Sequence, residues 1–313
     1  MTRVSLAGLA FARAGLSPDG ALVVSARELR RAVNVCRAHP KVAVLTAPDA
    51  GPAELARALF PQTPRSFVVC EGLDGPEERI VHVRPAEATT RPWTNPDVVL
   101  VLDDRRPPEE NGWIHGAALG PSEWALPQEA FGDATGLEPG IRAFVLAKLG
   151  PRLGDMVWDV GSGDGSVGIE CARFGAAVVA VERDKADYER VRENVRAHGV
   201  RVAVSRGEVP SVLDHLPEPD AVFTGRGGPE TLAACAERAL SRVAAVATAE
   251  EAPALLEVLS GRGFTAGAVE LRAAPMPAPV TVVWGRRGGP AAPSRPPRDV
   301  RRVETIPIVG LGP

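Results

Sequence analysis

Residues 157–170 read VWDVGSGDGSVGIE, and this stretch decides the fold of the region around it. An apolar run ends at Val160, glycines follow at positions 161, 163 and 165, and a helix is predicted for residues 165–173. A strand, a glycine-rich loop and a helix in this order open many nucleotide-binding α/β units, because glycine lets the backbone approach a ligand closely. The stretch therefore predicts a ligand site at the carboxyl end of a buried strand.

The spacing of the glycines bears on which ligand the loop takes. A dinucleotide loop has the pattern G-x-G-x-x-G, and here Ser166 stands at its third glycine position, with Gly165 one residue early. Asp159 adds a carboxylate at the end of the strand. S-adenosylmethionine carries an ammonium and a sulfonium instead of a pyrophosphate. The loop therefore favours this methyl donor.

Two further positions are predicted to contact the adenosine part of the ligand. Glu182 ends the next predicted strand, where an acid can accept hydrogen bonds from both ribose hydroxyls in NAD and S-adenosylmethionine proteins alike. Glu208 follows the third strand, where it either lies beside the adenine or serves as an acid at a helix start. The expected cofactor-binding set comprises Asp159, Gly161, Ser162, Gly163, Gly165, Glu182, Arg183, Gly207 and Glu208.

The pattern around this loop predicts a doubly wound sheet with a reversed edge. Strands are predicted at residues 155–160, 176–182, 201–205, 220–225 and 242–248, and helices at 165–173, 184–198, 229–240 and 251–262. Two more apolar runs, at residues 264–274 and 279–285, have no helix between them and predict an antiparallel hairpin. The expected fold is a Rossmann-like sheet of seven strands, typical of class I methyltransferases.

The preceding part of the chain predicts a smaller α/β region. Helices are expected at about residues 26–38 and 51–60, and continuous apolar strands at 41–46, 66–71 and 97–102, which indicates a sheet covered on both faces. Proline, glycine and charged residues mark a linker after it and a tail at the chain end. The expected divisions are a partial methylase-like domain at 1–104, a linker at 105–125, a methyltransferase domain at 126–285 and a tail at 286–313.

The composition excludes several classes of protein. The chain has 313 residues, 45% apolar and 24% charged, with a net charge of -3, so no broad basic field indicates nucleic acid. The four cysteines lie far apart without a C-x-x-C pair, so neither a disulfide framework nor a metal site is expected. Apolar runs are too short to span a membrane. We expect a cytoplasmic protein.

Longer segments carry a resemblance to a known family. Residues 136–173, 181–184, 207–210, 219–228 and 279–285 resemble the C15-methylating, decarboxylating precorrin methyltransferase of cobalamin biosynthesis. Residues 7–25, 39–46, 68–80 and 97–104 resemble the second half of the C5-methyltransferase of the same pathway. The two activities are often fused in this order, as bifunctional precorrin-6Y C5,15-methyltransferases. The first half of the C5 enzyme is not in this sequence, so C5 methylation is doubtful.

The resemblance implies the chemistry and the partners. It implies an enzyme that uses S-adenosylmethionine to methylate C15 of a precorrin, with loss of an acetate carboxylate, and it suggests a homo-oligomer. Substrate carboxylates need cations, so Arg142 and Arg226, with Gly227 beside the latter, are candidates for substrate binding. The family usually has Thr-Lys where this chain has Glu138 and Pro139, so a substrate role for that lysine does not carry over. No general acid or base is evident.

Two other functions stay open on the sequence. One is an NAD(P)-dependent oxidoreductase using the same loop, and the other is a methyltransferase-like scaffold that binds without catalysis. The last ten residues, ETIPIVGLGP, contain a short strand pattern at 306–309. We hypothesise that this segment adds a strand to the sheet of the first domain.

Overall fold

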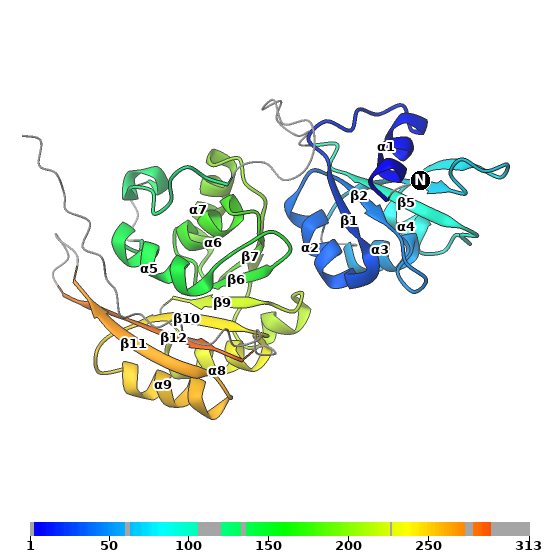
Figure 1. The fold of residues 1–313 in the computed structure, drawn as a ribbon. Helices are drawn as coiled ribbons and strands as arrows, with labels where there is room; N and C mark the ends of the chain where they lie inside the picture. The colour runs from blue at the N-terminus through cyan, green and yellow to red at the C-terminus, as the bar shows by residue number, and fades with distance from the viewer. Residues whose placement is uncertain are drawn as a thin grey trace, which may run out of the picture.

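The chain forms two α/β regions, each built around its own sheet (Figure 1). The computed structural model describes residues 3–59, 63–105, 120–132, 136–225, 227–272 and 278–288. We call residues 3–105 the N-terminal region and residues 120–288 the C-terminal region. The expected linker and tail fall mostly outside the described residues, as do Arg226 and the hypothesised strand at 306–309.

The N-terminal region contains a five-stranded mixed sheet in the order β1-β2-β5-β3-β4. Strand β1 pairs with β2 in parallel, and the other neighbours are antiparallel. Its helices are α1 (Arg3–Arg13), α2 (Leu29–Ala38), α3 (Pro52–Leu59) and α4 (Pro85–Ala88), with a short 3-10 turn, η1 (Ala26–Glu28). Its strands are β1 (Leu22–Ser25), β2 (Lys41–Leu45), β3 (Ser66–Glu71), β4 (Arg79–Val83) and β5 (Pro96–Leu102).

The sheet of the N-terminal region is covered on both faces, as its continuous apolar strands predicted. On one face α1 buries Phe11 against residues such as Leu100 of β5. On the other face α2 and α3 bury Val33 and Leu55 against the alternate residues of the same strands, Val99 among them. Burial on both sides explains why these strands read as uninterrupted apolar runs and not as alternating ones.

The C-terminal region contains the predicted seven-stranded sheet, in the order β11-β12-β10-β9-β6-β7-β8. Five strands are parallel, and β12 inserts antiparallel between β10 and β11, which confirms the reversed edge. Its strands are β6 (Met156–Val160), β7 (Ala177–Glu182), β8 (Val202–Arg206), β9 (Ala221–Thr224), β10 (Arg242–Ala247), β11 (Thr265–Leu271) and β12 (Val280–Arg286). Its helices are α5 (Pro139–Leu149), α6 (Ser166–Arg173), α7 (Lys185–Ala197), α8 (Gly228–Arg238) and α9 (Ala252–Gly261), with 3-10 turns η2 (Gln128–Phe131) and η3 (Ser211–His215).

Helix α7 shows how local sequence signals fix one of these elements. The carboxylate of Asp184 accepts hydrogen bonds from the backbone N–H groups of residues 186 and 187, so it caps the helix start as predicted. Val191 and Val195 are buried against the sheet, and Gly199 ends the helix with a φ of 63°. Helices α5, α6 and α7 cover one face of the sheet, and α8 and α9 cover the other.

The N-terminal region contacts the amino ends of the central strands of the second sheet. Arg30 of α2 donates two hydrogen bonds, of 2.7 and 2.8 Å, to Asp220, directly before β9. Asn34 donates to the carbonyl of Gly154, directly before β6. Figure 1 shows α2 on the side of the N-terminal region that faces the other sheet. The carboxyl ends of the strands, where ligands bind in doubly wound folds, are therefore left uncovered by these contacts. None of the described helices has the length and apolar character needed to cross a bilayer.

Candidate functional site

The glycine loop between β6 and α6 has a backbone that only glycine adopts easily. Gly161, Gly163 and Gly165 have φ values of 67°, 62° and 78°. At Gly165 a Cβ atom would also lie 3.0 Å from a methyl carbon of Val191, so the loop needs glycine there for space as well as for conformation. The loop is tied to the neighbouring strand, because Gly161 N–H donates to the carbonyl of Val181 at 2.9 Å.

A second glycine backs this loop from the end of β9. The backbone N–H of Gly225 donates to the carbonyl of Val160 at 2.8 Å, and a Cβ atom at Gly225 would lie only 2.4 Å from the carbonyl oxygen of Gly161. Gly225 therefore lets two backbone segments pack together.

Asp159 is the most buried acid beside the loop. Its side chain is fully buried in β6, and its Oδ2 atom accepts a hydrogen bond of 2.7 Å from the N–H group of Gly168. A Cβ atom added at Gly168 would lie 2.8 Å from the same Oδ2 atom, so this close approach requires glycine. The Oδ1 atom has no hydrogen-bond partner among the described residues. Burial, with the charges of Asp164 and Glu182 added, raises the pKa of Asp159 to about 8.

Two more carboxylates join Asp159 at this edge of the sheet. Glu182 ends β7 and accepts hydrogen bonds from the N–H groups of Gly163, at 2.5 Å, and Arg183, at 3.2 Å. Burial raises the pKa of Glu182. Asp164 is buried within the loop and accepts from Ser166 N–H at 2.9 Å. A cationic ligand bound at this edge would favour the charged forms of Asp159 and Glu182, whose pKa values burial raises.

The loop fits S-adenosylmethionine on the chemistry of its own atoms. Besides Oδ1 of Asp159, the hydroxyl of Ser162 is buried without a partner among the described residues, so two polar atoms are left for a ligand. An ammonium or sulfonium is compatible with three nearby carboxylates, whereas a pyrophosphate would be repelled by them. The geometry thus favours S-adenosylmethionine over a nicotinamide dinucleotide, a choice that Glu182 alone did not decide.

The three remaining residues of the expected cofactor set lie at the rim. Gly207 N–H donates to the carbonyl of Glu182 at 3.0 Å, which joins the loop after β8 to the end of β7. Glu208 and Arg183 form an ion pair at 3.5 Å with side chains 71% and 79% exposed. Both side chains therefore border the site from the solvent side and contribute little to its buried part.

Arg142 does not lie where a substrate residue is needed. Its guanidinium is fully buried, pairs with Glu170 at 2.8 Å, and donates to the carbonyls of Leu126 and Leu137. This geometry does not support the expectation that Arg142 binds substrate. The residue instead fastens the segment that precedes α5 to α6.

That segment supplies a residue that the sequence did not reveal. Gln128 donates a hydrogen bond of 2.9 Å to Asp164 in the glycine loop, and the N–H groups of Ala125 and Leu126 donate to the Glu170 carboxylate at 2.7 and 3.0 Å. No motif marks Gln128, because its partner lies 36 residues further along the chain. The segment at 120–132 is thus part of the support of the loop.

Neither a metal site nor a reactive thiol is found in the part of the chain that the structure describes. No group of three or more His, Cys, Asp or Glu side chains there could hold a metal ion. The four cysteines are buried, and burial raises the pKa of Cys36, Cys70 and Cys235 to about 12, so these thiols stay protonated and unreactive.

Comparison with known proteins identifies the family. The family model described as the precorrin methyltransferase domain matches residues 133–274. A relative from Pyrobaculum calidifontis, named probable cobalt-precorrin-6B C(15)-methyltransferase (decarboxylating), is 37% identical over 153 residues, which are 44% of this chain and 78% of the relative. The chain belongs to the precorrin methyltransferase family. The resemblance inferred from the sequence is confirmed.

Longer members of the precorrin methyltransferase family extend the match to the N-terminal region. A precorrin-6Y C(5,15)-methyltransferase [decarboxylating] from Sinorhizobium is 32% identical over 235 residues, 71% of this chain and 54% of the relative. The chain therefore spans about half the length of such relatives. Among solved structures, the C-terminal domain of precorrin-6Y C5,15-methyltransferase from Rhodobacter capsulatus is 29% identical, with a TM-score of 0.44, covering 52% of this chain and 97% of that chain.

Proposed function

We propose that the C-terminal region is an S-adenosylmethionine-dependent methyltransferase that methylates C15 of a precorrin and removes the carboxylate of an acetate side chain, in cobalamin biosynthesis. The observation that carries this proposal is the acidic glycine loop, with unpartnered polar atoms on Asp159 and Ser162, in a chain of this family. The names of the relatives supply the substrate class.

The residues of the loop divide the binding of the donor among them. The backbone of residues 161–165 lies against the methionine part, Asp159 and Ser162 provide acceptors for the ammonium, and the Glu182 carboxylate accepts from the ribose hydroxyls. The bound donor supplies a methyl group on a sulfonium, ready for in-line attack by an electron-rich carbon. The protein contributes position and exclusion of water, and the full burial of Asp159 supports this role.

The substrate side of the proposal rests on the loop after β9. Gly227 lies at the start of α8, close to the glycine loop through the backbone of Gly225. Arg226 between them lies outside the described residues, and we propose it as a cation for a substrate carboxylate. Arg142 is not part of this proposal, because its charge is already matched by Glu170.

The oxidoreductase alternative is disfavoured by the same site. A nicotinamide dinucleotide would place two phosphates near three acids, and burial already raises the pKa of two of them, Asp159 and Glu182. A scaffold without catalysis would bind the donor equally well, so binding alone does not test the proposal. We also propose a cytoplasmic homo-oligomer that acts on a free precorrin without nucleic acid or membrane.

The decisive experiment is a product analysis. Purified protein is incubated with precorrin-6Y and S-adenosylmethionine labelled in the methyl group, and the labelled carbon and the loss of CO₂ are followed by NMR and mass spectrometry. Label at C15 together with one decarboxylation is expected, and label at C5 would show that the N-terminal region is active as well. Donor binding without any methyl incorporation would support the scaffold instead.

A further inference from the structure

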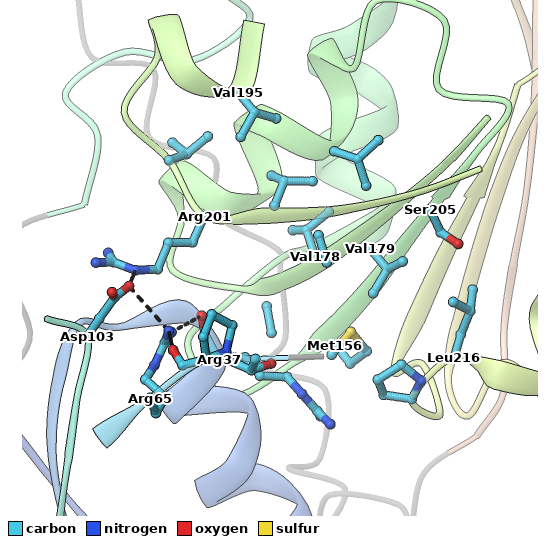
Figure 2. A pocket seen from close by; sticks show the side chains of 18 of the residues that line it. Arg37, Arg65, Asp103, Met156, Val178, Val179, Val195, Arg201, Ser205 and Leu216 are labelled. Atoms are coloured by element: carbon cyan, nitrogen blue, oxygen red, sulfur yellow. Dashed lines mark hydrogen bonds and ion pairs between the residues drawn. The ribbon is translucent and has the colours of Figure 1, made fainter. Parts of the chain in front are cut away.

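A cavity of about 560 Å³ is lined by residues of both regions (Figure 2). Its lining from the C-terminal region comes from the first residues of β6 and β7, from β8, and from the segment before β9. None of these lining residues belongs to the expected cofactor-binding set. The cavity is therefore distinct from the donor site in the residues that form it.

Most of the lining from the C-terminal region is apolar. Val179 of β7, Ala203 of β8 and Leu216 before β9 line it, and Figure 2 shows Val178, Val179 and Val195 gathered on this side. A volume of this size falls within the range of roughly 300–1,000 Å³ that is usual for small-molecule sites. The wall can accept the apolar body of such a molecule.

The charged part of the lining, which comes from both regions, has an excess of positive charge. Among the described lining residues are four arginines, at positions 37, 65, 105 and 201, and a single acid, Asp103. Figure 2 shows Asp103 between Arg65 and Arg201, and the ion pairs measure 3.2 and 3.0 Å. One carboxylate thus pairs with two guanidinium groups, and Asp103 is the one acid among the described lining residues.

Arg37 shows the imbalance most clearly. Its guanidinium donates to the side-chain oxygen of Asn34 at 3.0 Å and to the carbonyl of Ala58 at 2.7 Å, both of them uncharged acceptors. Burial lowers the pKa of Arg37 to about 10 and also lowers that of Arg65. A cation that is partly desolvated without a counter-charge is stabilised when an anion binds beside it.

We propose that this cavity binds an organic anion, a carboxylate or a phosphate joined to an apolar body. The anionic group lies among Arg37, Arg65 and Arg201, and the apolar body lies against Val179 and Ala203. Because the arginines at 37 and 65 belong to the N-terminal region and the apolar wall belongs to the C-terminal region, the ligand contacts both and stabilises their association. This site is independent of the proposed methyltransferase activity.

The test uses the full chain with excess S-adenosylmethionine present to occupy the donor site. Calorimetric titrations at low salt compare 2-naphthoate, which carries a carboxylate, phenyl phosphate, which carries a phosphate, and neutral 2-naphthol. We expect at least one anionic probe to bind and to raise the melting temperature, with 2-naphthol at least tenfold weaker. The stronger of the two anions identifies the preferred anionic group.

Two substitutions locate the binding. Arg37→Gln removes one cation and is expected to weaken the anionic probe about tenfold, the usual effect of losing one charge-assisted hydrogen bond. Ala203→Phe changes an exposed residue of β8 and fills the apolar part of the cavity. We expect it to weaken binding of the anionic probe at least as much as Arg37→Gln does. Arg31→Gln is the matched control, because Arg31 lies on the same helix but does not line this cavity.

The proposal fails on any of three results. These are no binding of either anion to the unmodified protein, equal binding of 2-naphthol, or an affinity unchanged in both Arg37→Gln and Ala203→Phe. Because Ala203→Phe changes an exposed side chain, it remains informative if Arg37→Gln does not fold. Failure here would leave the methyl-transfer assay unaffected, so the two proposals are tested separately.

Discussion

The two ends of the second sheet hold their acids in opposite ways. At the amino end, Asp155 pairs with Arg242 at 2.5 Å and Asp220 pairs with Arg30 at 2.7 Å. At the carboxyl end, no ion pair is found for Asp159 within the described residues, and its only hydrogen bond comes from a backbone N–H. Both groups of acids are buried, yet only the first has arginine partners.

The pKa values follow the same division. Burial alone would raise the pKa of Asp220, but hydrogen bonds from Arg30 and from Met156 N–H outweigh it and lower the pKa. Burial dominates at Asp159 and raises the pKa to about 8. An acid with its own arginine is a structural element, whereas a buried acid without one is available to a cationic ligand. Four substitutions test this contrast.

The largest effect is expected at the amino end, for Arg242→Met. The change leaves the Asp155 carboxylate, which is fully buried, with only the weaker contact to Arg152 at 3.2 Å. Removing one partner of a buried ion pair costs about 3–5 kcal/mol of unfolding free energy. Chemical denaturation measures this loss, and Arg152→Met, whose side chain is 65% exposed, is the control. A loss below about 1 kcal/mol would remove the structural role assigned to this pair.

Gly225→Ala comes next and acts at the carboxyl end. The added Cβ atom would lie 2.4 Å from the Gly161 carbonyl oxygen, so the glycine loop must shift. Such overpacking costs about 1–3 kcal/mol, and we expect donor affinity measured by calorimetry to fall by roughly ten- to a hundredfold. Gly261→Ala is the control, because no atom lies within 4 Å of the position of its added Cβ. Equal donor affinity in the two variants would contradict the packing role.

Asp159→Asn tests the unpaired acid through pH. In the unmodified protein, donor affinity should rise up to about tenfold per pH unit between pH 6 and 7.5, because the carboxylate form becomes more abundant as the pH approaches its pKa. The variant should bind about tenfold more weakly at pH 7.5 and show a flatter profile. Between pH 5 and 8 the folded protein keeps a proton on Asp159 that the unfolded chain has already lost. The free energy of unfolding of the ligand-free protein should therefore fall relative to that of the variant as the pH rises through this range. Parallel pH profiles in both proteins would refute the assignment.

The smallest effect is expected for Arg30→Gln, which removes the paired cation between the two regions. The Arg30 side chain is 42% exposed, so its pair with Asp220 contributes only about 1 kcal/mol or less. Hydrogen exchange should show faster opening of the contact between α2 and the strand starts, with donor affinity unchanged. If Arg30→Gln lowered donor affinity as much as Asp159→Asn does, the amino end of the sheet would also contribute to donor binding, and the contrast between the two ends would be wrong.

Much of the C-terminal region could be predicted because its signals are local. Apolar strands, the cap at Asp184 and the stop at Gly199 each depend on residues a few positions apart. Helix α1 was not predicted. Its buried face consists mainly of Ala7, Ala10 and Phe11, and the small alanine side chains give only a weak helical pattern of apolar residues. Strand β4 was missed because most of its residues are not fully buried.

The site was predicted where it depends on the loop and not where it depends on distant partners. The backbone of Gly161 and the burial of Asp159 follow from residues within the motif. The interpretation of Arg142 failed because its partner Glu170 lies 28 residues away, and amphipathic spacing does not show which face such a pair occupies. Gly225 likewise gains its meaning only from the strand order that brings it against Gly161.

The fastening of the segment at 120–132 also sets an order of events during synthesis. Its N–H groups at Ala125 and Leu126 are made well before Glu170, which lies 44 residues beyond Leu126. While the ribosome adds those residues, this segment has no carboxylate to hold it, and Arg142 has no partner for its charge. The contacts between the segment at 120–132, Arg142 and Glu170 can therefore form only after α6 has been synthesised.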